Sequence, residues 1–294
     1  MTLVPISVSV RDQIVPVLTG ETLFEVIRRL GVSRIEATVN AEELLPYLRD
    51  REGVAPSIRD DASVRNLTGQ LQAEGVQISA ILLATDFSAE DADRHISWAV
   101  RVIHTASEMQ TPVVRIDPWT SRDDLPPQTI MDNFVRRVER ILDQTSDTPV
   151  DVAMENHGRL FNDPQILDQV LKAIPNPRFG LTLDAGNLYW WGHPISRVYE
   201  LIERYAHRVK HTHIKNIAYP LARRDVPREI GFEYKKYCSP LYEGDLDLRR
   251  IVEAVRQGGY QRDFCVEDES LFKASEGDQK EVLRRDIACL RRAQ

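Results

Sequence analysis

Hydrophobic positions follow two alternating periods along this chain. Short apolar runs such as Arg34–Val39 are typical of strands, in which side chains alternate between the two faces of a sheet. Segments like Glu21–Leu30 follow them, with apolar residues every three or four positions, which form one stripe of a helix. The chain therefore consists of repeated strand-then-helix units.

The pattern predicts eight of these units. The strands are expected at Pro5–Val10, Arg34–Val39, Val76–Ala84, Pro112–Ile116, Val150–Met154, Phe179–Leu183, Val209–Ile214 and Phe264–Val266. The helices are expected at Glu21–Leu30, Glu42–Arg49, Ser63–Glu74, Ala89–Ser107, Asp132–Leu142, Pro164–Ala173, Ser196–Tyr205, Leu246–Arg256 and Gln279–Arg292. Such alternation implies parallel strands, because a parallel crossover needs about a dozen residues.

Two α/β architectures fit eight parallel units. An open doubly wound sheet usually carries a Gly-rich phosphate turn after its first strand, but Arg11-Asp12-Gln13 stands there instead. A closed (β/α)8 TIM barrel typically uses about 250 residues, and no Pro/Ser-rich linker divides this chain of 294. The sequence therefore favours a single barrel domain over residues 1–294.

Composition excludes several other classes of protein. With 42% hydrophobic and 28% charged residues, the chain has the composition of a globular protein with a sizeable core. The net charge of -7 argues against a nucleic-acid partner, and no run approaches the roughly 18 apolar residues of a membrane helix. Met1–Asp12 lacks a secretory pattern, and three cysteines make no disulfide framework. We therefore expect a cytoplasmic protein with no membrane partner.

The connection between the seventh strand and its helix is unusually long. Residues 216–245 show no clear element, and structureless loops beyond about 15 residues are uncommon unless they form lids or binding loops. A floppy insertion is the alternative. The segment carries several aromatic residues, which favour an ordered cover: Tyr219, Phe232, Tyr234, Tyr237 and Tyr242. We expect a lid over the end of the barrel.

Acidic and imidazole groups end four consecutive strands, at the face where barrel enzymes place their active sites. They lie in Met154-Glu155-Asn156-His157, Leu183-Asp184-Ala185-Gly186-Asn187, His211-Thr212-His213-Ile214-Lys215 and Val266-Glu267. Each residue alone has a structural alternative, as a helix cap or a core histidine. Four together favour a bound cation, because buried carboxylates otherwise repel one another.

We therefore predict one divalent metal ion, bound by Glu155, Asp184, His213 and Glu267. Three carboxylates and one imidazole form an oxygen-rich set, which favours Mn²⁺ or Mg²⁺ and leaves Co²⁺ or Zn²⁺ open. Four protein ligands also leave coordination positions for substrate oxygens, as a Lewis acid requires.

These motifs resemble a known family. VAMENHG at 152–158, LDAGN at 183–187, HTHIKN at 211–216, EGDLD at 243–247 and GGYQRDFCVE at 258–267 are similar to the xylose isomerase-like barrels of the sugar phosphate isomerase/epimerase superfamily. The likeness spans the chain as strand-helix order and is specific mainly in the second half. It implies the same four metal ligands, and a homo-oligomer by analogy with related barrels.

The resemblance implies a metal-dependent isomerase or epimerase of a sugar or keto-sugar. Catalysis is then proton abstraction by Glu155 or Glu267 through a metal-stabilised enediolate. A lyase or dehydratase acting on a keto-inositol or keto-glycoside is the alternative. Phosphodiester hydrolysis, as in the apurinic endonucleases, needs more histidine ligands than this chain offers, and a non-catalytic sugar-binding barrel would not need the complete ligand set.

Two positions depart from many ketose epimerases of this kind. Asn187 replaces a histidine three residues after the metal-binding aspartate, and Tyr219 replaces an arginine six residues after the metal-binding histidine. Both contact substrate in those relatives, so the substrate stays open. Three arginines of the long loop could supply a cation, although a solvated charge run is favoured: Arg223, Arg224 and Arg228.

The remaining candidates are polar or aromatic residues near strand ends. Each has a structural alternative as a support for other side chains, a salt-bridge partner or a packing residue. As substrate-binding residues we expect His157, Asn187, Lys215, Trp119 and Arg115.

Overall fold

Parallel strands close into one barrel in the computed structural model, which describes residues 6–88, 91–122 and 124–293. The strand order around the barrel is β1-β10-β7-β6-β5-β4-β3-β2. Their bounds are β1 (Val8–Arg11), β2 (Arg34–Thr38), β3 (Gln77–Leu83), β4 (Val113–Ile116), β5 (Asp151–Glu155), β6 (Phe179–Asp184), β7 (Val209–Ile214) and β10 (Phe264–Val266). The prediction of a (β/α)8 barrel is confirmed.

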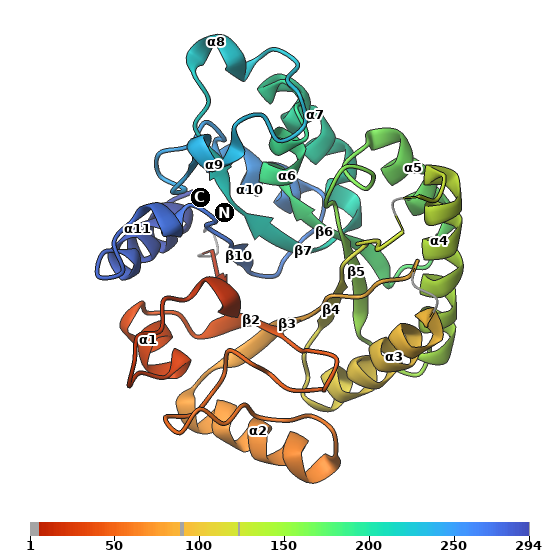
Figure 1. Ribbon diagram of the computed structural model, residues 1–294, viewed down its shortest axis with the longest axis vertical. Coiled ribbons are helices and arrows are strands. Elements are labelled where there is room, and N and C mark those ends of the chain that lie inside the picture. The colour runs from red at the N-terminus through yellow and green to blue at the C-terminus, as the bar shows by residue number, and fades with distance from the viewer. Residues whose placement is uncertain (1–5, 89–90, 123, 294) are drawn as a thin grey trace.

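Helices surround this barrel on the outside (Figure 1). The longer ones are α1 (Leu23–Arg29), α2 (Asp61–Glu74), α3 (Ala92–Glu108), α4 (Pro127–Gln144), α5 (Pro164–Ala173), α7 (Ile195–Tyr205), α10 (Leu248–Gln257) and α11 (Gln279–Arg291). Short helices are α6 (Ala185–Trp190), α8 (Leu221–Arg224) and α9 (Tyr234–Tyr237), with 3-10 turns η1 (Asp12–Ile14), η2 (Ala206–Arg208) and η3 (Leu271–Lys273). None of the described helices is long and apolar enough to cross a membrane.

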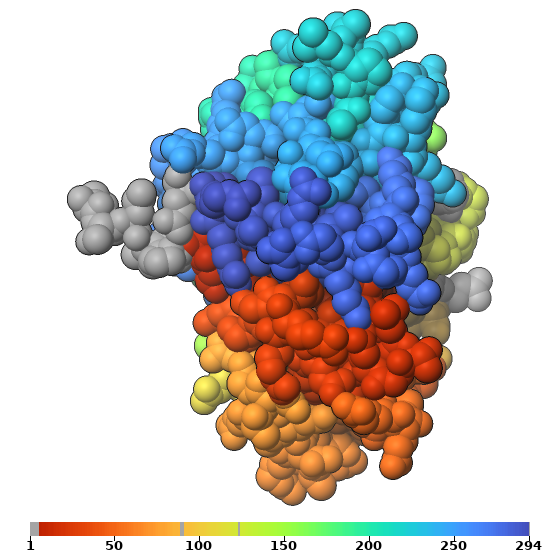
Figure 2. Space-filling view, turned by 90° about the vertical axis from the view of Figure 1, so that its left-hand side faces the viewer, coloured from red at the N-terminus to blue at the C-terminus, as the bar shows by residue number. Residues whose placement is uncertain are grey.

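Strands from the two ends of the chain complete the barrel. Val8 of β1 lies opposite Phe264 of β10 in a parallel pair. Figure 2 shows the red N-terminal segments packed directly against the blue C-terminal ones. The first half of the chain is therefore part of the same closed domain as the motif-rich second half.

Local chemistry sets several element boundaries. Thr22 and Glu25 form a capping box at the start of α1. Helix α4 begins at Pro127, earlier than the predicted Asp132, because proline suits the first turn of a helix. The predicted starts at Pro5 and Ala89 lie outside the described residues.

The predicted helix at Glu42–Arg49 is wrong. The side chain of Asn40 accepts hydrogen bonds from the backbone N–H groups of Glu42 and Leu44, at 3.1 and 2.9 Å. Such local bonds give the backbone an alternative to a helix. Leu44 then forms an antiparallel bridge with Ser57, so this stretch is a turn and an extended segment.

Residues 216–245 are ordered by short elements and by one half-buried cation, Arg228. Strand β8 (Asn216–Ile217) pairs antiparallel with β9 (Cys238–Ser239). The Arg228 guanidinium lies 4.4 Å from the ring centroids of both Tyr189 and Tyr219. It also donates hydrogen bonds to the backbone oxygens of Tyr189 and His193. The prediction that Arg228 belongs to a solvated charge run is therefore wrong, because its charge holds this segment against α6.

A pair of carboxyl groups holds the same segment to the last helix. Oδ1 of Asp286 on α11 accepts a hydrogen bond from the Leu241 N–H at 2.6 Å. Burial and the neighbouring carboxylate of Asp268 raise the pKa of Asp286 to about 9. Neither Oδ2 of Asp286 nor Oδ2 of Asp268 has a conventional hydrogen-bond partner among the described residues, so a proton on Asp286 relieves the repulsion between the two carboxyl groups.

Replacing Gly180 should destabilise the barrel. A Cβ at this β6 position would lie 2.0 Å from the backbone oxygen of Arg208. We expect Gly180→Ala to lower the free energy of unfolding by roughly 1–3 kcal/mol. The matched control is Gly69→Ala in α2, where a Cβ meets nothing within 4 Å and should add about 0.5–1 kcal/mol. Urea unfolding measures both, and wild-type stability of Gly180→Ala would contradict the packing argument.

Replacing Asp286 should change how stability depends on pH. Its raised pKa means that the folded state binds the proton more tightly, so this contribution is present at low pH and is lost as the pH rises from about 4 through about 9. Asp286→Asn keeps an acceptor for Leu241 and a donor for Asp268. We expect it to gain more than about 1.4 kcal/mol over wild type near pH 8. Thermal unfolding measures the effect; parallel pH profiles would show that Asp286 carries no such proton.

Candidate metal centre

The four predicted ligands come together at the carboxyl ends of their strands. Glu155 ends β5, Asp184 ends β6, His213 lies near the end of β7, and Glu267 directly follows β10. One ligand atom from each lies within 4.8 Å of the others, and all four residues are at most 2% exposed. The parallel register produces this meeting, because Asp184 is paired with His213.

His213 lies between two of the carboxylates. Its Nδ1 is 3.1 Å from Oε1 of Glu155 and 3.1 Å from Oε2 of Glu267. Burial lowers the pKa of His213, but the carboxylates of Glu267 and Glu36 outweigh it and raise the pKa to about 9. A protonated imidazole therefore supplies positive charge between the two carboxylates at neutral pH.

Two arginines hold the outer oxygens of the same carboxylates. Arg115 of β4 pairs with Oε2 of Glu155, and Arg11 of β1 pairs with Oε1 of Glu267. Burial opposes ionisation of Glu267, yet His213 and neighbouring cations hold its pKa well below the ordinary value. The other oxygen of each carboxylate, Oε1 of Glu155 and Oε2 of Glu267, therefore faces His213. The carboxylate of Glu267 is charged.

The two carboxylate oxygens of Asp184 have different partners. Oδ1 accepts a hydrogen bond from the Asn187 N–H at 2.9 Å and so caps α6. Oδ2 lies 3.0 Å from Nζ of Lys215 but accepts no hydrogen bond of ordinary geometry from the described residues. Burial raises the pKa of Asp184, although Lys215 opposes the rise. A buried carboxylate oxygen without a hydrogen bond, in a set of three carboxylates and one imidazole, fits a divalent cation.

The other predicted residues occupy different distances from this cluster. Nδ2 of Asn187 donates to Oε1 of Glu155 at 3.2 Å, and so lies within the site. His157 lies at the edge, with its side chain 44% exposed and Nδ1 3.3 Å from Asp117. Trp119 follows β4 and is 56% exposed, so its substrate contact stays a prediction.

The contacts that support His213 were not predicted from the sequence. Oε2 of Glu36 on β2 lies 2.8 Å from Nε2 of His213 and 2.8 Å from Nε2 of His211. The signal in the sequence is a glutamate within a short apolar strand. Its partners could not be read there, because the contact crosses the barrel.

Tyr234 is a second residue whose role the sequence did not reveal. Its hydroxyl donates to Oε2 of Glu269 at 2.5 Å, and Oε1 of Glu269 lies 3.0 Å from Nζ of Lys215. The segment 216–245 thereby places a phenol in a chain of polar groups that ends at the metal ligands. Only its aromatic content was visible in the sequence.

The fold and the ligand cluster define a class of protein, a (β/α)8 barrel with a candidate metal centre at its carboxyl-terminal face. The family model for the xylose isomerase-like TIM barrel matches residues 24–293. The chain belongs to this family. No curated protein matches the sequence.

Solved structures similar to the chain include metal-bound members and an epimerase. The IOLI protein with a bound zinc atom is 16% identical at a TM-score of 0.72, covering 98% of this chain and 99% of its own. A xylose isomerase-like TIM barrel protein from Mycobacterium smegmatis, in complex with magnesium, is 18% identical with a TM-score of 0.68. The match covers 98% of this chain and 97% of that protein. L-ribulose 3-epimerase is 15% identical with a TM-score of 0.66, and the match covers 97% of this chain and 95% of the epimerase. Likeness at these identities shows the fold.

Protons and metal ions should compete for His213. Nδ1 must lose its proton before it can bind a cation, so affinity should rise with pH. With a pKa of about 9, we expect the Kd for Mn²⁺ to fall about tenfold per pH unit between about pH 6 and pH 8. Calorimetry on EDTA-treated protein in buffers of different ionisation enthalpy measures affinity and released protons together. A constant Kd over this range would refute the competition.

Proposed function

We propose that this protein is a metal-dependent isomerase or epimerase of a sugar or keto-sugar. Glu155, Asp184, His213 and Glu267 would hold one divalent cation, which their oxygen-rich set suggests is Mn²⁺ or Mg²⁺, with Co²⁺ or Zn²⁺ as substitutes. Such a cation polarises a substrate carbonyl and acidifies the neighbouring C–H group. The observation that carries the proposal is the pair Glu155 and Glu267, each 3.1 Å from Nδ1 of His213.

The two glutamates perform the proton transfer. One takes the proton from the carbon beside the carbonyl, and the electrons of the broken C–H bond form an enediolate. In an epimerase the other glutamate returns a proton to the opposite face of that carbon, whereas in an isomerase a proton goes to the neighbouring carbon. Arg115 and Arg11 keep the two carboxylates in fixed orientations, which this geometry requires.

Substrate oxygens have several donors nearby. Nε and Nη1 of Arg115 are buried and have no hydrogen-bond partner among the described residues. Together with Asn187, Lys215 and His157 they suit the hydroxyl and carbonyl oxygens of a carbohydrate. Residues 216–245 would then act as a cover that excludes water, with Tyr234 beside the substrate.

A lyase or dehydratase is the second candidate. The same enediolate expels a group from the next carbon when an acid protonates the departing oxygen. The connected groups Tyr234, Glu269 and Lys215 favour this candidate, because they bring two proton donors to the edge of the metal ligands.

Deuterium exchange separates these activities. The Mn²⁺-loaded protein is incubated in D₂O with keto-sugars and 3-keto glycosides. Deuterium in recovered sugar supports the isomerase or epimerase, and release of an aglycone or of water supports the lyase. The enzyme proposal fails if no substrate exchanges and metal analysis finds no bound ion.

Glu155→Gln should abolish exchange and also destabilise the protein. The substitution leaves Arg115 as a buried charge without its partner, at a cost of about 3–5 kcal/mol. The double variant Glu155→Gln/Arg115→Met removes both charges, so we expect it to recover stability but not exchange. Urea unfolding and deuterium exchange are measured on both variants. Wild-type exchange in either one would remove Glu155 from the mechanism.

A further inference from the structure

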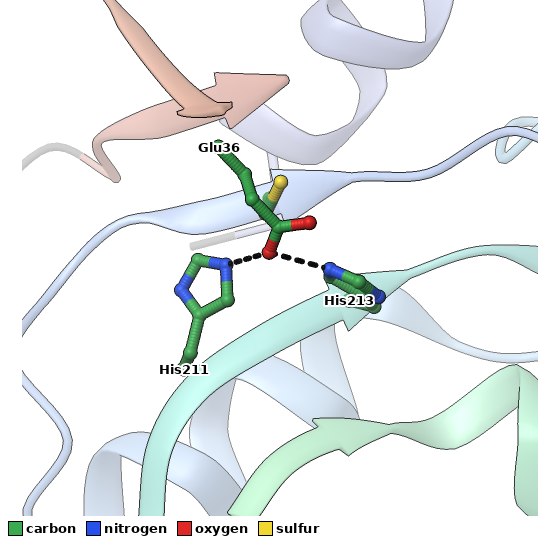
Figure 3. Close-up of side chains that lie close together, drawn as sticks. Glu36, His211 and His213 are labelled. Carbon is green, nitrogen blue, oxygen red and sulfur yellow. Dashed lines mark hydrogen bonds and ion pairs between the residues drawn. The ribbon is translucent and has the colours of Figure 1, made fainter. Parts of the chain in front are cut away.

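Glu36 makes a contact across the inside of the barrel. It lies on β2, whose barrel neighbours are β1 and β3, whereas His211 and His213 lie on β7, between β10 and β6. Figure 3 shows its carboxylate directed between the two imidazoles. One oxygen, Oε2, is 2.8 Å from Nε2 of each ring, and all three residues are at most 1% exposed. Two nitrogens therefore converge on a single buried carboxylate oxygen.

This contact decides which nitrogen of His213 carries a proton. A carboxylate only accepts hydrogen bonds, so Nε2 of His213 must donate to Glu36. In a neutral imidazole the other nitrogen, Nδ1, then keeps its lone pair. Nδ1 is the atom that lies 3.1 Å from Glu155 and from Glu267. When His213 is neutral, the lone pair is thus directed into the candidate metal centre.

We infer that Glu36 is a positioning residue of the metal centre, which fixes the tautomer and the ring orientation of His213, while His211 keeps Glu36 in place. The inference rests on the proposed metal site. Residues that bind the second nitrogen of a metal-ligating histidine commonly change metal affinity 10–100-fold when replaced.

His211 and Arg11 explain how Glu36 is held. The His211 ring meets the His213 ring nearly edge-on, at a centroid distance of 5.7 Å and an angle of 76°. Nε of Arg11 lies 3.8 Å from the other oxygen of Glu36, Oε1. Cationic or N–H groups therefore lie on both sides of the carboxylate, which restricts its rotation.

A metal ion could instead bind among Glu36, His211, His213 and Cys265, whose ligand atoms also lie within 4.8 Å of one another. That ion would use Nε2 of His213 and leave the proton on Nδ1. The two sites therefore require opposite tautomers of one ring. The cluster around Glu36 has a single carboxylate, whose Oε2 accepts a hydrogen bond from His213, whereas its Oε1 accepts none from the described residues. The cluster with Asp184 has three carboxylates and one imidazole, so it concentrates more negative charge and has the greater need of a cation.

The test measures affinity and tautomer together. Glu36→Gln keeps the size of the side chain and removes its charge, so we expect Mn²⁺ and Zn²⁺ to bind about 10–100-fold more weakly by calorimetry. Cys265→Ser is the matched control from the same cluster, and its affinity should equal that of wild type. In the zinc-loaded wild-type protein, ¹⁵N NMR should show His213 protonated at Nε2. Melting in EDTA reports whether each variant folds.

Several results would overturn the inference. One is an unchanged metal affinity of folded Glu36→Gln, and another is zinc-loaded wild-type protein with His213 protonated at Nδ1. A sulfur-to-cobalt charge-transfer band in the Co²⁺-loaded protein that Cys265→Ser removes would also overturn it, as would a wild-type protein that binds no divalent ion. The NMR result does not depend on the variant folding. Weaker metal binding in Glu36→Gln with no sugar exchange in wild type would support the role of Glu36 and refute the proposed activity. Unchanged metal binding in Glu36→Gln together with sugar exchange in wild type would refute the role of Glu36 and support the proposed activity.

Discussion

The balance of charge inside the barrel is the constraint on which the rest of the structure depends. The carboxylates buried around His213 are each at most 2% exposed: Glu36, Glu155, Asp184 and Glu267. Removing an ion from water costs several kcal/mol in a protein interior, so unpaired carboxylates would drive the strands apart or take up protons. The fold holds them by placing a cation or an imidazole N–H group against each one.

The positions of those partners leave one region of the cluster open to a further cation. The arginines hold the outer oxygens of Glu155 and Glu267, on the sides away from His213. Asp184 uses one oxygen to cap α6, and the other lies 3.0 Å from Nζ of Lys215 without a conventional hydrogen bond. The remaining negative charge is therefore concentrated around Nδ1 of His213. In the absence of a metal ion a proton on that nitrogen balances the charge, which makes proton and metal alternative occupants of the same position.

The sequence was sufficient to predict that the candidate ligands come together, but it did not predict which residues support them. Glu155, Asp184 and His213 end apolar strands, and strand ends meet at one face of any parallel barrel, so their proximity follows from local patterns. Glu36 contacts His213 only because the barrel closes with a particular register, which no local pattern encodes. The apolar residues of Glu42–Arg49 have helical spacing, but the side chain of Asn40 accepts hydrogen bonds from backbone N–H groups of this segment, which therefore forms a turn instead of a helix.

The structure gives a physical role to Asn187 and Tyr219, the two positions at which the chain differs from many ketose epimerases. Nδ2 of Asn187 donates to Glu155, so it acts on a metal ligand as well as facing the site. Tyr219 is 1% exposed, and Arg228, which lies against its ring, donates to the backbone of the α6 region. Arg228 is thus committed to packing, and in the proposed function the phenol of Tyr234 would lie beside the substrate instead. Because the Tyr234 hydroxyl donates its only proton to Glu269, its oxygen is left as an acceptor, so in the proposed function it would suit a substrate hydroxyl group rather than a strongly anionic group.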